Sequence, residues 1–409
     1  MQRDAQDRGP EGADPAAVSV PTPFQPQYAA QAASWWQLIG LFAKLGVVAF
    51  GGPVAHIAIM DKEVVERRRW IDRRHFLDLI AATNLLPGPN STQMTMHIGY
   101  VQRGNLGVVA AGTAFILPAA LITLAVTWAY ATYRDLPVMD AVFAGIQPVV
   151  LAIIATAIVK LAPQAADDLR TRVVFVAALA LGLFGVNELL VLALGAVAGL
   201  LATQRWAARG TTGLLVLTTP WLLGAARASG SAEADTLGQL AWLFFKFGIT
   251  LFGSGYLLVA YLQRDLVERT GLLSASGLLE ALVIGEMTPG PLFTVSTAVG
   301  YLLGGVPGAA VATSAIFLPS FLLAMALGRL MPAVKRSDAA KRLLSGLTAA
   351  VLGVMLAVTV ELALRVIVDV PAGVLAAAAL ATLIWTRVSA IALIPLGGLI
   401  GFLWLEVLG

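Results

Sequence analysis

Two lysines stand where their chemistry could matter. Lys44 and Lys246 occupy the same place in two similar apolar segments, 41–46 and 243–248. An ammonium group inside an apolar segment is costly and usually faces a cavity or a partner. The symmetric pair therefore predicts attraction of an anionic substrate. The alternative is that each lysine lies near a helix end and that its side chain reaches the lipid headgroups.

A second feature is a helix breaker that occurs twice. The two motifs are Pro87-Gly88-Pro89 and Pro289-Gly290-Pro291. Proline lacks a backbone N–H and glycine permits unusual backbone angles, so each motif ends one helix, and a new one starts at Asn90 or Leu292. A helix N-terminus offers free N–H groups and a partial positive charge, which suit an anion. The alternative is a simple packing kink.

One carboxylate near these motifs has no match in the other copy. Glu286 lies three residues before the second Pro-Gly-Pro, where the first copy has Asn84. An acid beside an anion site makes sense as a proton carrier whose charge is coupled to substrate occupancy. The alternative is that Glu286 pairs with a lysine or is hydrogen-bonded within the helix bundle.

These motifs belong to an internal duplication. Each Pro-Gly-Pro follows a Phe-Gly break and precedes Gly-Tyr and Leu-Pro pairs, and the two copies align at a nearly constant offset. The breaks are Phe50-Gly51-Gly52-Pro53 and Phe252-Gly253-Ser254-Gly255. Their glycines Gly51, Gly52 and Gly253 complete the candidate substrate site, with Asn90 at the start of the first new helix. Repeated helix breakers in apolar segments are typical of transporters whose site lies at the breaks between two repeats.

The elements that position these residues follow from the same pattern. We expect a disordered tail over 1–33 without a signal peptide, a first repeat over 34–203, a linker over 204–236 and a second repeat over 237–409. Each repeat is predicted to hold a broken helix, a charged amphipathic stretch, half-length helices on both sides of Pro-Gly-Pro, two full spans and two short terminal spans.

Composition sets the class of protein. Hydrophobic residues make up 58% of the 409 residues and charged residues only 12%, about half the charged fraction of soluble domains. The apolar runs are long enough for helical spans and do not alternate as β-barrel strands do. The fold class is therefore an all-α polytopic membrane protein. There is no cysteine, which excludes disulfides and thiolate metal sites, and the scattered histidines give little support to any metal site.

The basic residues indicate how the repeats are oriented. Loop 61–75 carries six Lys and Arg residues and its counterpart 262–276 carries two, whereas loop 131–139 carries one and its counterpart 329–342 carries five. The bias reverses between the halves, as the positive-inside rule predicts for inverted repeats. A re-entrant Pro-Gly-Pro hairpin gives about five crossings per half, with loop 61–75 in the cytoplasm and both termini outside. The net charge of +3 is explained in the same way and does not require nucleic-acid binding.

Polar residues after the breaks could bind substrate oxygens or only their neighbours. The candidates are Ser91, Thr92, Gln93, Thr294, Ser296 and Thr297. Taken singly, each is expected to bond a neighbouring helix or its own backbone. His56, just past the first Phe-Gly break, is expected to be a satisfied bundle residue.

The ordered set of motifs resembles the chromate ion transporter family, in its long form with two fused homologous domains. The matching residues are Phe50 to Pro53, Asn84 to Pro89, Gly99-Tyr100, Glu286 to Pro291 and Gly300-Tyr301. The resemblance covers almost the whole chain from residue 35. It implies antiparallel repeats in the bacterial inner membrane that export chromate and confer resistance, with sulfate as the look-alike anion. The second Phe-Gly break lacks the proline of the first, so the two breaks are not expected to be equal.

The function predicted is a secondary transporter without a cofactor. The nucleotide-binding pattern Gly-x-x-x-x-Gly-Lys-Ser/Thr is absent, so an ion gradient is expected to drive transport. The alternatives are a channel or carrier for another small anion such as sulfate and, less favoured, a membrane enzyme. The expected partners are chromate, sulfate and the lipid bilayer, and a homodimer is left open.

Overall fold

The computed structural model describes residues 33–49, 52–83, 86–165, 168–201, 232–251, 257–336, 338–386, 388 and 390–404. Regular structure within these residues is helical throughout. The first half contains α1 (Trp35–Val48), α2 (Gly52–Met60), α3 (Arg73–Thr83), α4 (Asn90–Tyr133), α5 (Pro137–Ala165), α6 (Leu169–Leu183) and α7 (Glu188–Leu201). The second contains α8 (Ala232–Thr250), α9 (Leu257–Tyr261), α10 (Ala275–Met287), α11 (Val295–Arg336), α12 (Asp338–Val366), α13 (Val370–Trp385) and α14 (Ala390–Phe402). Most of the expected tail and linker lies outside the described residues.

The helices have the lengths of a multi-pass membrane protein. Four helical segments in the described part of the chain, in α4, α5, α11 and α12, are long and apolar enough to cross a membrane, and shorter apolar helices accompany them. This agrees with the predicted all-α membrane class. The count of about ten crossings stays a prediction.

Helix α4 is a tight hairpin of two helices. The backbone leaves helical geometry at Arg103 and at Gly104, whose φ of 60° and ψ of −148° suit glycine alone. A Cβ on Gly99 would lie 2.8 Å from that of Ala111, although twelve residues of straight helix would separate them by ~18 Å. The segment 90–102 is therefore a half-length helix that folds back on the following span. Helix α11 makes the same turn at Gly304 and Gly305.

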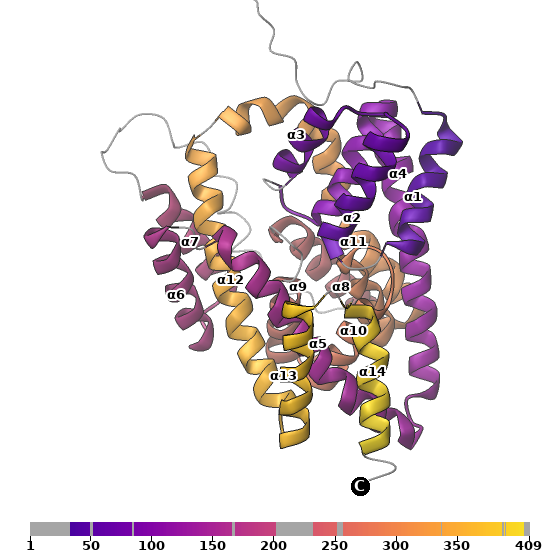
Figure 1. The fold of residues 1–409 in the computed structure, drawn as a ribbon, viewed down its shortest axis with the longest axis vertical. Helices are drawn as coiled ribbons and strands as arrows, with labels where there is room; N and C mark the ends of the chain where they lie inside the picture. Colours follow the sequence, from indigo (N-terminus) through magenta and orange to yellow (C-terminus); the bar gives the residue numbers. More distant parts are fainter. Residues whose placement is uncertain are drawn as a thin grey trace, which may run out of the picture.

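The two halves exchange their terminal helices. Helix α5 of the first half packs against α13 and α14 of the second, and α12 of the second packs against α6 and α7 of the first (Figure 1). Glycines allow the helices to approach closely, since a Cβ on Gly145 of α5 would lie 2.6 Å from the backbone nitrogen of Gly401 in α14. Gly346 of α12 meets Gly199 of α7 in the same way. Neither half buries its own terminal helices.

The centre of the molecule is built by the remaining helices. Helix α1 packs on α4, α8 packs on α11, and α4 packs on α11. Each broken helix, α1–α2 and α8–α9, leads into a short π-helical segment, Asp61–Arg67 or Leu262–Arg269. The Pro-Gly-Pro motifs lie between α3 and α4 and between α10 and α11, and the helices that follow the two motifs, α4 and α11, pack against each other.

Candidate functional site

Each Pro-Gly-Pro motif forms a sharp break with glycine at its centre. Gly88 has a φ of 113° and Gly290 a φ of 104°, which side-chain-bearing residues rarely adopt. After the break, α4 begins at Asn90, whereas the second copy starts with a short 3₁₀ turn at Leu292–Thr294 before α11. The expected new helix N-termini are therefore present in both copies.

The two motifs are held by reciprocal hydrogen bonds between the repeats. The N–H of Gly88 donates to the carbonyl of Leu251 over 2.6 Å, and the N–H of Gly290 donates to the carbonyl of Ala49 over 3.0 Å. Leu251 and Ala49 directly follow α8 and α1, where the Phe-Gly breaks begin. We call the Gly88–Leu251 contact the first crossing and the Gly290–Ala49 contact the second crossing. Each crossing joins the Pro-Gly-Pro of one repeat to the helix break of the other.

Polar side chains surround the first crossing. A Cβ on Gly88 would lie 2.5 Å from Oγ of Ser320 and 2.9 Å from Nε2 of Gln93. Nε2 of Gln93 donates to the carbonyl of Pro87 over 2.7 Å. Oγ of Ser320 and Oε1 of Gln93 are buried without a hydrogen-bond partner among the described residues. Burying such groups unpaired costs ~1–3 kcal/mol each, so this cluster has unused hydrogen-bonding capacity.

The second crossing has a different lining. A Cβ on Gly290 would meet the Cβ of Ala119, which stands where the other copy has Ser320. The carbonyl of Ala49 also lies 3.0 Å from Nε2 of His56, which is buried. His56, expected to be a satisfied bundle residue, thus contacts the second crossing directly. Beside the motif, the hydroxyls of Thr123 and Thr288 lie 3.0 Å apart.

Both predicted lysines are paired with carboxylates. Lys246 forms an ion pair with Asp265, and Lys44 lies 3.8 Å from Glu63. The side chain of Lys246 is 19% exposed and that of Lys44 is 59% exposed. Lys246 precedes Leu251 by five residues, about 7.5 Å along a helix, and Lys44 precedes Ala49 by the same interval. Each lysine therefore lies on the helix that ends at one crossing.

The acidic partners were not singled out as site residues by the sequence. Glu63 and Asp265 occupy equivalent positions in the two π-helical segments. Each also pairs with the arginine four residues later, Arg67 or Arg269. The signal that could have found them is the repeat alignment, in which a lysine, an acid and an arginine recur at matching positions.

Glu286 lies in the last turn of α10 and is half-buried. No lysine or arginine in the described ranges forms an ion pair with it. The lysine pairing considered for Glu286 is therefore not found there. Its counterpart Asn84 lies outside the described residues.

Most of the other predicted site residues lie within the described structure, and two lie outside it. Pro89 and Pro289 are buried. Pro291 caps the 3₁₀ turn that precedes α11, as Pro89 caps α4. Gly52 is the first residue of α2. Gly51 and Gly253 lie outside the described residues. The polar residues after the breaks are all buried: Ser91, Thr92, Gln93, Thr294, Ser296 and Thr297.

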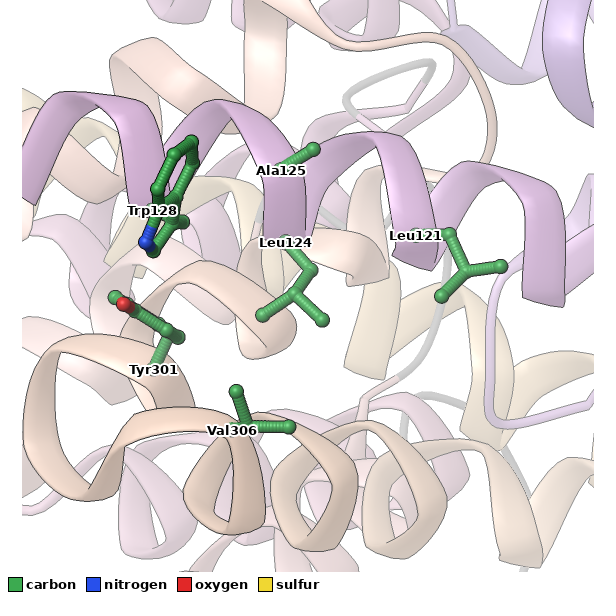
Figure 2. A pocket seen from close by; sticks show the side chains of 6 residues that line it. All are labelled: Leu121, Leu124, Ala125, Trp128, Tyr301 and Val306. Carbon is green, nitrogen blue, oxygen red and sulfur yellow. The ribbon is translucent and has the colours of Figure 1, made fainter.

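A surface groove of about 230 Å³ lies between α4 and α11 (Figure 2). It is lined by Leu121, Leu124, Ala125, Trp128, Tyr301 and Val306. Leu121, Trp128 and Val306 are more than half exposed, as expected of a lipid-facing surface. Such an apolar lining suits acyl chains and offers no counter-charge for an anion. In the described residues there is also no group of three or more potential metal ligands.

Comparisons with known proteins point to one family. The model of the chromate transporter family matches residues 36–200 and 238–402. A chromate transport protein of Cupriavidus metallidurans is 31% identical over 354 residues, which cover 85% of this chain and 87% of that protein. A chromate transport protein of Pseudomonas aeruginosa is 30% identical over 365 residues, 87% and 85% of the two chains. No solved structure matches.

Proposed function

Since this chain belongs to the chromate transporter family, we propose that it is a secondary active transporter that exports chromate across the bacterial inner membrane and so confers chromate resistance. Chromate is a tetrahedral dianion and a structural analogue of sulfate. The relatives described above are named chromate transport proteins, which favours transport over an enzymatic reaction. Energy is taken from an ion gradient.

The reciprocal pair of crossings is the observation that carries this proposal. Gly88 and Gly290 each hydrogen-bond a carbonyl at the helix break of the opposite repeat. A relative movement of the two repeats changes both contacts together. Broken helices at the interface of two repeats are where secondary transporters bind solutes and ions. The substrate is thus proposed to bind at the Pro-Gly-Pro helix starts and the Phe-Gly breaks.

The lysines supply the charge that a dianion needs. Lys44 and Lys246 each lie on the helix that ends at one crossing, and each is paired with a carboxylate, Glu63 or Asp265. A dianion that reaches either ammonium group competes with that carboxylate. Release of the substrate restores the internal ion pair, so the lysine is never left without a counter-charge.

The repeats are proposed to be antiparallel, with loop 61–75 in the cytoplasm. The reversed distribution of basic residues supports this orientation. The reciprocal hydrogen bonds support a two-fold relation between the repeats. Glu286, half-buried beside the second crossing and without an ion-pair partner among the described residues, is proposed as the proton carrier.

Uptake of radiolabelled chromate into inside-out membrane vesicles tests the function and its coupling. Export from a cell corresponds to uptake here, and an acidic vesicle interior should stimulate it, because protons leave as chromate enters. Glu286→Gln cannot release a proton, so this variant should keep chromate exchange but lose the stimulation.

Two results would contradict separate parts of this proposal, one the transport of chromate and the other the role of Glu286. Uptake no greater than in vesicles without the protein would exclude chromate transport. Equal stimulation of wild type and Glu286→Gln by the gradient would exclude Glu286 as the proton carrier and leave transport itself intact.

Another small anion such as sulfate is the second candidate substrate. The hydroxyl and amide groups at the first crossing recognise oxyanion geometry that sulfate shares with chromate. Competition between the two anions in the same vesicles distinguishes these substrates. The preferred anion should inhibit uptake of the other anion at a lower concentration than is needed in the reverse experiment.

A further inference from the structure

The two crossings differ in chemistry although they share one backbone arrangement. Gly88 is flanked by Ser320 and Gln93, whereas Gly290 is flanked by Ala119. The alignment offset that relates Gly88 to Gly290 relates Gln93 to Val295. At these two positions the first crossing therefore carries a hydroxyl and an amide, whereas the equivalent residues are alanine and valine. The polar groups at the second crossing are different ones, namely the imidazole of His56 and the hydroxyls of Thr123 and Thr288.

The fold does not require the polar groups of the first crossing. Ala119 fills the position equivalent to Ser320 and is also buried, so a methyl group is enough for packing there. Oγ of Ser320 has no hydrogen-bond partner among the described residues. A buried hydroxyl without a partner destabilises the closed structure relative to alanine. Only one of the two copies has this unpaired hydroxyl, which points to a ligand at the first crossing.

The same place has the donors that an oxyanion needs. The half-length helix of α4 starts at Asn90 directly after the crossing, and its first backbone N–H groups lack intrahelical acceptors and carry the positive end of the helix dipole. The hydroxyl of Ser320 supplies one further donor. The amide of Gln93 has two N–H donors, one of which is used by the carbonyl of Pro87.

Charge is available from the helix that ends at this crossing. Lys246 lies on α8, about 7.5 Å along the axis from Leu251, whose carbonyl accepts the Gly88 N–H. Its ammonium group is mostly buried and is paired with Asp265. Lys44, at the other crossing, is largely exposed. The more sheltered cation thus lies on the helix that ends at the crossing with Ser320 and Gln93.

We propose that the first crossing is the oxyanion-recognition site and that Gln93 and Ser320 select a tetrahedral dianion through neutral hydrogen bonds. This inference rests on the proposed function and adds to it that the two repeats contribute unequally. Ser320 belongs to the second repeat and Gln93 to the first, so the complete site exists only when both repeats meet. The structure shows the crossing closed, with Gly88, Gln93 and Ser320 all buried, and substrate enters when the repeats separate.

Chromate uptake by purified full-length protein in proteoliposomes tests the proposal. Ser320→Ala should raise the KM for chromate about tenfold, the effect of one lost hydrogen bond. Its thermal stability should be unchanged or higher, because an unpartnered buried hydroxyl is removed. A purely structural role predicts the opposite combination, with lowered stability and an unchanged KM. Gln93→Met keeps the length of the side chain. It should also raise the KM for chromate and the sulfate concentration that is needed to inhibit chromate uptake.

Thr348→Ala is the control because it also removes a hydroxyl, but from an exposed threonine of α12 that donates to the carbonyl of Leu344 in its own helix. Its KM should stay within twofold of wild type. The proposal is wrong if Ser320→Ala and Gln93→Met both keep the wild-type KM, or if Thr348→Ala changes it as much as Ser320→Ala does. A wild-type protein that takes up no chromate contradicts the proposed function instead, which is a separate outcome.

Discussion

Lys246 and Lys44 occupy equivalent positions but have different surroundings. The Lys246–Asp265 pair is mostly buried, with side chains 19% and 9% exposed. Lys44 is 59% exposed, and its partner Glu63 also binds Arg67 and Arg68. Removing one partner of a buried pair leaves an uncompensated charge, whereas an exposed pair contributes little.

This difference predicts unequal effects of two alanine substitutions. Lys246→Ala should lower the free energy of unfolding by about 2 kcal/mol, because Arg269 at 3.5 Å only partly compensates Asp265. Lys44→Ala should cost less than ~1 kcal/mol. Both should weaken chromate uptake, and the double variant should abolish it. Thermal unfolding in detergent and vesicle uptake measure the two effects.

Lys160→Ala is the control for these substitutions, because Lys160 is an exposed lysine of α5 and should change neither quantity. Wild-type uptake by the Lys44→Ala/Lys246→Ala double variant would show that the lysines do not serve the substrate.

At the scale of elements, glycines decide how closely the exchanged helices pack. Gly145 of α5 meets Gly397 and Gly401 of α14, and Gly346 of α12 meets Gly195 and Gly199 of α7. The same spacing of small residues thus recurs on both terminal helices. In a membrane, where lipid is as apolar as the side chains, such close backbone contact is what holds helices together.

Gly145→Ala should therefore separate α5 from α14. The added methyl would lie 2.6 Å from a backbone nitrogen and 2.7 Å from a backbone Cα of Gly401, and backbone atoms move away only with the whole helix. The expected loss of stability is ~1–3 kcal/mol, measured by thermal unfolding. Gly40→Ala in α1 is the control, because nothing lies within 4 Å of its added Cβ and helix propensity alone should make it neutral or stabilising. Equal melting temperatures for the two variants would contradict this packing role.

At the scale of the whole molecule, the repeats depend on each other. The terminal helices of each half pack on the other half, and each Pro-Gly-Pro is held by the opposite helix break. A single repeat would leave these surfaces without their partners. The two halves are therefore expected to form one folding unit.

Expression of the protein as two separate chains, 1–203 and 204–409, tests this dependence. Either chain alone should be degraded or aggregate, because its packing surfaces are exposed. Together they should co-purify and restore part of the chromate uptake. Transport by either chain expressed alone would show that the exchange of helices is not required.

The sequence alone predicted the helical membrane class, the duplication and the positions of the helix breaks. These properties are local, since the missing N–H of proline and the backbone freedom of glycine act wherever the residues occur. The repeat alignment also identified Lys44 and Lys246 as equivalent. The site residues derived from these patterns stay predictions.

The tertiary structure decided which of these local features meet. Gly88 contacts Leu251 rather than the break in its own repeat, and Ser320 reaches the first crossing from α11 of the second repeat. Lys246 and Asp265 form a pair whose burial no residue pattern reveals. Such contacts depend on how distant helices pack, and packing is a property of the assembled surfaces rather than of any one segment. The same motif, which occurs twice in the sequence, thus meets Ser320 and Gln93 at one crossing and Ala119 at the other only through the packing of the two repeats.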